Sequence, residues 1–73
     1  MMNKYIFVQH KYSDIDAETI EKIKAEKLPL VCISGNFSNS GDFLYLVSDG
    51  NSNIRAWFIE KKYAIEYAEF ISN

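Results

Sequence analysis

Apolar residues along this 73-residue chain recur with two different spacings, one typical of strands and one typical of helices. Short runs rich in aromatic and β-branched residues favour strands, because such side chains pack well on a pleated surface. A continuous apolar run that ends at a Ser-Gly pair favours a strand that is buried on both faces. The expected strands cover residues 4–9, 30–33, 43–48 and 54–59, and the buried run is 30–33.

Two further segments have the three- and four-residue apolar spacing of an amphipathic helix. The first begins near residue 14, where Ser13 and Asp16 have the spacing of a weak capping box. It ends at or just before Leu28, because Pro29 disfavours the helical conformation in the residue that precedes it. The second covers residues 60–71. The expected order of elements is therefore β-α-β-β-β-α.

The connections between these elements complete the predicted fold. Residues 49–53 contain an Asp-Gly pair and two asparagines, which supply the positive φ angles of a hairpin turn. Residues 35–42 are small and polar apart from Phe37 and are expected to form a loop. A chain of this length is too short for two domains. We therefore predict a single α+β domain over residues 1–73, with a four-stranded, mainly antiparallel sheet and two helices.

Composition and charge exclude some classes of function. Ten acidic and eight basic side chains give a net charge of −2, so the basic excess that nucleic-acid binding usually requires is missing. The single cysteine, Cys32, cannot form an internal disulfide, and with the single histidine it does not complete the usual ligand set of zinc. The first apolar run is too short for a signal peptide or a membrane span. We expect a cytoplasmic protein without membrane contact.

No residue pattern indicates catalysis, a cofactor or a bound metal. Gly35 and Gly41 do not belong to a phosphate-binding loop, because Asp42 follows where Lys and Ser or Thr are needed. Cys32 lies in an apolar run, where an inert buried thiol is expected rather than a nucleophile. His10 is expected on the surface, since no nucleophile is placed beside it by a known spacing. We therefore expect no enzyme activity, no cofactor and no metal.

Alternation along the strands separates an aliphatic side from an aromatic side of the sheet. The aliphatic side is expected to hold Ile6, Val8, Leu44, Leu46, Ala56 and Phe58. If both helices cover that side, the aromatic side is exposed and available to a partner. The residues expected to bind the partner are Tyr5, Phe7, Tyr45, Arg55 and Trp57, with Phe37 in the loop. In the alternative arrangement the helices lie on opposite faces or cover the aromatic side, and the aromatic residues belong to the core.

These features predict a small non-catalytic protein-protein interaction module whose partner is another protein or a second copy in a homodimer. In its size, its lack of catalytic motifs and its bias toward Ile, Lys, Asn and Tyr, the chain resembles small accessory or inhibitor proteins of bacteriophages and mobile elements, although the resemblance covers no motif. It implies a protein that acts by occupying the surface of a host protein. The alternatives are a purely structural homodimer and single-stranded nucleic acid stacked on the aromatic sheet face, which the strand order and the thin basic rim argue against.

Overall fold

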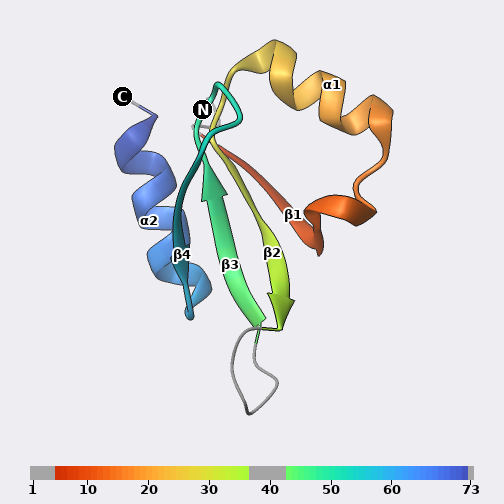
Figure 1. Ribbon diagram of the computed structural model, residues 1–73. Coiled ribbons are helices and arrows are strands. Elements are labelled where there is room, and N and C mark those ends of the chain that lie inside the picture. The colour runs from red at the N-terminus through yellow and green to blue at the C-terminus, as the bar shows by residue number, and fades with distance from the viewer. Residues whose placement is uncertain (1–4, 37–42, 73) are drawn as a thin grey trace.

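Four strands form a mixed sheet with one helix against each face in the computed structural model, which describes residues 5–36 and 43–72 (Figure 1). The elements in chain order are β1 (Ile6–Lys11), a 3-10 helix η1 (Tyr12–Asp14), α1 (Ala17–Glu26), β2 (Leu30–Asn36), β3 (Phe43–Ser48), β4 (Ile54–Phe58) and α2 (Lys61–Ile71). The sheet order is β1-β2-β3-β4, with β1 parallel to β2 and the other two pairs antiparallel. The α+β class, the element order and the mainly antiparallel sheet expected from the sequence are confirmed.

The strands agree closely with the expected ranges. β3 covers the expected residues, β4 ends one residue early, and β1 lies two residues further along the chain than expected. β2 continues to Asn36, because this residue pairs with Phe43 at the start of β3. Leu30, Val31 and Cys32 are all buried, which confirms the prediction of a strand buried on both faces. Of the expected loop, residues 37–42 lie outside the described residues.

α1 begins later than the sequence indicated. Ser13 lies in η1, and the N-cap is Asp16, whose carboxylate accepts a hydrogen bond from the backbone N–H of Thr19 at 3.3 Å. Hydrogen bonding to Thr19 lowers the pKa of Asp16. At the other end, Lys27 adopts the left-handed conformation with a φ of 54°, two residues before Pro29. The helix therefore ends where the proline predicted.

α2 packs on one face of the sheet through two small side chains. Ala64 and Ala68 are fully buried against Val31 of β2 and Val47 of β3. Because alanine adds little bulk, the helix lies close to the strands, and larger half-buried side chains surround the contact. These are Tyr5, Phe7, Tyr45, Phe58, Tyr67 and Ile71. α2 therefore covers the aromatic side of the sheet.

α1 covers part of the opposite face. Ile23 is the one buried residue in this ten-residue helix, and it packs with Leu30 and Cys32 of β2. The half-buried side chains that complete this second cluster are Ile6, Val8, Ile15 and Leu46. Figure 1 shows α1 on the side of β1 and β2, and α2 beside β3 and β4. The expectation that both helices share a face is therefore wrong, and the alternative with the helices on opposite faces is correct.

The side chains of β4 also lie on different faces of the sheet from those expected, as the pairing of β4 with β3 shows. Trp57 lies opposite Leu46, and Ala56 lies opposite Val47. Since paired residues point to the same side of a sheet, Trp57 belongs to the α1 face. Ala56 belongs to the α2 face, and Phe58, which pairs with Tyr45, belongs there too. The prediction that Ala56 and Phe58 share a face with Leu46 is therefore wrong.

A register shift next to the hairpin explains this reversal. Ser48 pairs with Ile54 at the end of the ladder. If that register continued, Ala56 would lie opposite Leu46, as the sequence suggested. The register shifts between Val47 and Ser48 instead, so that β4 has one extra residue at this point. A shift by one residue moves all later side chains to the other face of the sheet.

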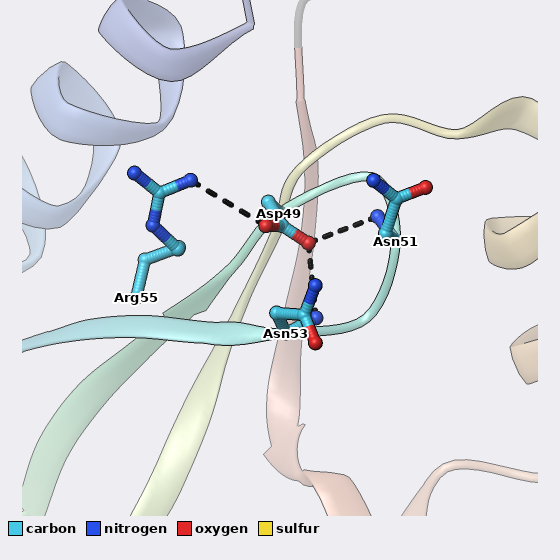
Figure 2. A network of polar contacts seen from close by, with 4 residues as sticks. All are labelled: Asp49, Asn51, Asn53 and Arg55. Carbon is cyan, nitrogen blue, oxygen red and sulfur yellow. Dashed lines mark hydrogen bonds and ion pairs between the residues drawn. The ribbon is translucent and has the colours of Figure 1, made fainter.

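Asp49 organises the turn between β3 and β4 (Figure 2). Its Oδ1 accepts hydrogen bonds from the backbone N–H groups of Asn51 and Asn53, both at 2.9 Å, and its Oδ2 lies 3.4 Å from Nη1 of Arg55. The hydrogen bond from Asn53, followed by those from Asn51 and Arg55, lowers the pKa of Asp49. Ser52 adopts a positive φ of 68°. The predicted hairpin is confirmed, but the positive φ lies at Ser52 and not at the Asp-Gly pair or the asparagines that were expected to supply it.

Gly50 in the same turn lies directly against the end of α1. A Cβ atom at Gly50 would overlap the backbone carbonyl oxygen of Lys27 and lie 2.8 Å from its carbonyl carbon. Because the obstacle is backbone, it cannot move aside as the end of a flexible side chain can. The turn and the end of α1 therefore pack together only if residue 50 is glycine.

We predict that Gly50→Ala lowers the free energy of unfolding by about 1–3 kcal/mol, since the added methyl group forces the turn away from Lys27. Urea denaturation measures the change. Asn51→Ala is the matched control, because the Asn51 side chain is exposed in the same turn. The control is expected to stay within about 0.5 kcal/mol of the wild type. Similar losses in both variants would contradict the close contact.

We predict that the carboxylate of Asp49 stabilises the fold in a pH-dependent manner. Asp49→Asn keeps an oxygen for the two backbone N–H groups but removes the charge that faces Arg55. The folded-state pKa of Asp49 is lowered. The stabilisation of the fold by the ionised Asp49 carboxylate is therefore complete above the unfolded-state pKa of about 3.9, and it is lost as the pH falls through the folded-state pKa.

Urea denaturation of the wild type and Asp49→Asn at about pH 7 and about pH 3 tests this linkage. At about pH 7 the wild type is expected to be more stable than Asp49→Asn. This difference in the free energy of unfolding is expected to shrink at about pH 3. Asp49→Ala, which removes every acceptor of the side chain, is expected to be the least stable of the three at neutral pH. A difference between wild type and Asp49→Asn that does not change with pH would contradict a role for the charge.

Candidate functional site

The α1 face of the sheet is covered unevenly. α1 buries one side chain, Ile23, against the part of the sheet formed by β1 and β2. Over β3 and β4, Leu46 is half-buried, and its cross-strand partner Trp57 keeps 50% of its surface exposed. Ile54 at the start of β4 is 55% exposed. This part of the sheet therefore presents apolar side chains that neither helix covers.

These strands border an open hollow of about 330 Å³, which we call the apolar groove. It is lined by Tyr12 from η1, Leu46 and Ser48 from β3, Ser52 from the turn and Ile54 from β4. Tyr12 reaches it because the chain turns through η1 directly after β1, and the side chain remains 44% exposed. The lining is apolar apart from hydroxyl groups and carries no charged side chain. The groove therefore suits an apolar group and offers no counter-charge to an ionic ligand.

The reactive residue types lie elsewhere. Cys32 is fully buried in β2, and burial raises the pKa of its thiol to about 11, so the thiol is protonated at neutral pH and packs as an apolar group. His10 is exposed on β1, as the sequence suggested. No three His, Cys, Asp or Glu side chains within residues 5–36 and 43–72 lie close enough together to hold a metal ion. In that same part of the chain, neither helix has the length and apolar character needed to cross a membrane.

Three of the six residues expected to bind a partner lie beneath α2. Tyr5, Phe7 and Tyr45 are half-buried around the core cluster on the α2 face. The rings of Phe7 and Tyr45 lie 6.5 Å apart, and Nζ of Lys61 in α2 lies 4.3 Å from the centre of the Phe7 ring. The exposed aromatic sheet face expected from the sequence is therefore wrong, because α2 covers it.

The other three residues have separate positions. Trp57 is exposed, but on the opposite face from Tyr45, where it lies next to the apolar groove. Arg55 is exposed on β4 and makes an ion pair with Asp49. Phe37 lies outside the described residues. The structure thus separates Trp57 from the aromatic residues with which the sequence grouped it.

Tyr12 and Ile54 are groove residues that the sequence did not indicate. Tyr12 follows a polar pair between two elements, so it belongs to no apolar period. Ile54 belongs to a strand whose faces reverse at the register shift. The available signal for the register shift was the five-residue connection before Ile54, because a hairpin connection of three to five residues that contains Gly indicates a bulge or a longer loop.

A second pair of exposed aromatic side chains lies on α2. Tyr63 is 47% exposed and Phe70 is 73% exposed. Since they are seven positions apart, they lie on the same side of the helix, and this side differs from the one formed by Ala64 and Ala68. Nζ of Lys62 lies 5.0 Å from the centre of the Tyr63 ring. These two residues provide a matched comparison for Tyr12 and Trp57, because they are aromatic and exposed but belong to α2, which packs on the opposite face of the sheet from the groove.

The apolar groove with Trp57 beside it is the strongest candidate for a functional surface in the described part of the chain. It combines a hollow, two partly exposed aromatic side chains and an incomplete helical cover. Comparisons of the chain with family models, with curated proteins and with solved structures find no match.

Proposed function

We propose that this protein is a protein-interaction module that binds another polypeptide through the apolar groove and Trp57. The observation that most supports the proposal is the half-exposed Trp57 next to Leu46, on a sheet face that α1 leaves partly open. Apolar patches of this kind on soluble proteins commonly mark interaction sites. Trp and Tyr are also enriched among the residues that contribute most of the binding energy at protein interfaces.

The lining of the groove favours an apolar side chain of a polypeptide over a charged ligand. Tyr12, Leu46 and Ile54 supply apolar walls, and two serine residues supply hydroxyl groups. A half-exposed Trp leaves on the order of 100 Å² to be buried. At about 25 cal/mol per Å², covering Trp57 alone contributes about 2.5 kcal/mol. This gain is large enough for Trp57 to dominate a small interface.

Binding is itself the activity of such a module. The chain resembles phage and mobile-element accessory or inhibitor proteins in size and composition, which supports a role in which it occupies the surface of a host protein. The cytoplasmic location and the lack of enzyme activity expected from the sequence remain part of this proposal.

Nucleic acid has less support as a ligand of the sheet. α2 covers Tyr5, Phe7 and Tyr45, so these rings are not available as a platform for stacked bases. The net charge of −2 gives little attraction to phosphate groups. A polypeptide partner is therefore the proposal that the observations favour.

We predict that the double variant Tyr12→Ser, Trp57→Ser loses at least about tenfold in affinity for the protein partner, which corresponds to 1.4 kcal/mol. Both side chains are partly exposed, so the variant is expected to fold, and circular dichroism checks this. The immobilised chain captures its partner from a lysate of the source cells, and titration with the purified partner then gives the affinities of wild type and variant.

The matched control for this experiment is the double variant Tyr63→Ser, Phe70→Ser, which removes two exposed aromatic side chains from α2. It is expected to bind as the wild type does. Equal affinity of wild type and the groove variant would refute the assignment of the groove. Binding of a labelled single-stranded oligonucleotide that weakens steeply with salt would favour the nucleic-acid alternative.

A further inference from the structure

β4 is an edge strand whose outer side is open in the described part of the chain. It pairs with β3 on its inner side, and the sheet order ends there. Among residues 5–36 and 43–72, the backbone hydrogen bonds found outside the helices and sheet ladders involve none of residues 54–58. Within these residues, the backbone N–H and C=O groups that point outward from β4 therefore have no backbone partner. Such a row of groups pairs readily with another strand.

The two edges of the sheet differ in how well they are protected against such pairing. β1 ends in three exposed polar residues, 9–11, and its register with β2 is irregular after Phe7. β4 contains neither Lys nor Pro, two residue types that commonly keep an edge strand unpaired. Its single charge, on Arg55, is paired with Asp49 of the same chain. The edge that is open to pairing is therefore β4.

We propose that β4 pairs antiparallel with β4 of a second copy of this chain, so that the two four-stranded sheets join into one continuous sheet in a homodimer. This inference goes beyond the proposed function, because it uses the outer edge of β4 rather than the apolar groove, and its partner is a second copy of the chain. The interface is isologous, with the same strand contributed by each copy. A twofold axis perpendicular to the sheet keeps both α2 helices on one face and both Trp57 side chains on the other, next to each other.

The two ends of β4 match in apolar character, since each carries an exposed isoleucine. An antiparallel pair brings the beginning of each strand next to the end of the other. Arg55, which pairs with Asp49, lies near the beginning, and Glu60, which Lys61 and Lys62 follow, lies after the end, so charges of both signs meet at both ends of the interface. Ile54, 55% exposed, and Ile59, 72% exposed, are brought together in the same way. The match of these two exposed isoleucines favours a second copy over an unrelated strand.

The size of the contact indicates whether the dimer belongs to the permanent or the transient class of interface. A standard interface buries about 800 Å² on each partner, which is about 15% of the 5197 Å² that this chain exposes. The exposed parts of Ile54, Trp57 and Ile59, with the backbone of a five-residue edge, supply roughly half of that area. We therefore expect a dimer that dissociates on dilution rather than a permanent one.

Sedimentation equilibrium and amide hydrogen exchange of the wild-type chain, both over a range of concentrations, test the proposal. The mass is expected to rise from one chain toward two chains. The outward-pointing amides of β4 are expected to exchange at least about tenfold more slowly at high concentration, whereas the outward-pointing amides of β1 are expected not to change. A mass of one chain at every concentration would overturn the inference. A dimer whose β4 amides stay unprotected would also overturn it.

Ile59→Lys and Phe70→Lys provide a matched pair of variants. The two side chains are 72% and 73% exposed, so both variants are expected to fold. Ile59→Lys places a positive charge at the end of β4, close to Arg55 of the second copy, and is expected to weaken the dimer at least about tenfold. Phe70→Lys on α2 is expected to dimerise as the wild type does. The same dissociation constant for both variants would overturn the proposed pairing.

Tyr12→Ser separates a failure of this inference from a failure of the proposed function. Tyr12 lines the groove but belongs to η1, not to the edge strand. If the chain remains monomeric while capture of another protein depends on Tyr12, the proposed function stands and the pairing of β4 is overturned. If β4 is protected in a dimer that Tyr12→Ser does not weaken, the pairing is supported whether or not the groove binds a further protein.

Discussion

The contact of two alanines in α2 with two valines in the central strands determines the arrangement of the rest of this structure. Ala64 and Ala68 are fully buried against Val31 and Val47. The small alanine side chains let the helix approach the sheet closely, and the Tyr and Phe side chains around this contact are half-buried as a result. α2 thereby covers the aromatic face. The opposite face is left to α1, which contributes only Ile23 to the core.

This unequal division of the two faces produces both of the proposed binding features. A domain of this size buries only about 60% of the surface that its unfolded chain exposes. Here the two helices, of ten and eleven residues, leave part of the sheet uncovered. The uncovered part lies over β3 and β4, where it includes the apolar groove and Trp57. β4 borders this open part and is also an edge strand of the sheet that the described residues form. Within the described residues, one strand thus presents both an apolar face and an open backbone edge.

The hairpin before β4 positions this strand relative to α1. Asp49 binds the backbone of the turn and the side chain of Arg55, and Gly50 lies against the carbonyl group of Lys27 at the end of α1. The same turn is followed by the register shift that places Trp57 opposite Leu46. The exposure of Trp57 next to the groove therefore depends on one extra residue in β4 and on the geometry of a tight turn.

The sequence by itself determined the local structure of this protein. Turn residues, apolar spacing and the position of Pro29 predicted the order of elements, the hairpin, the end of α1 and the buried strand, because each depends on neighbours within a few positions. Only the tertiary structure decided which face each helix covers and on which face Trp57 lies. These depend on the register between strands and on contacts between residues far apart in the chain, and one extra residue reverses them. For that reason Tyr5, Phe7 and Tyr45, expected at a binding surface, lie beneath α2, whereas Trp57 is exposed on the other face.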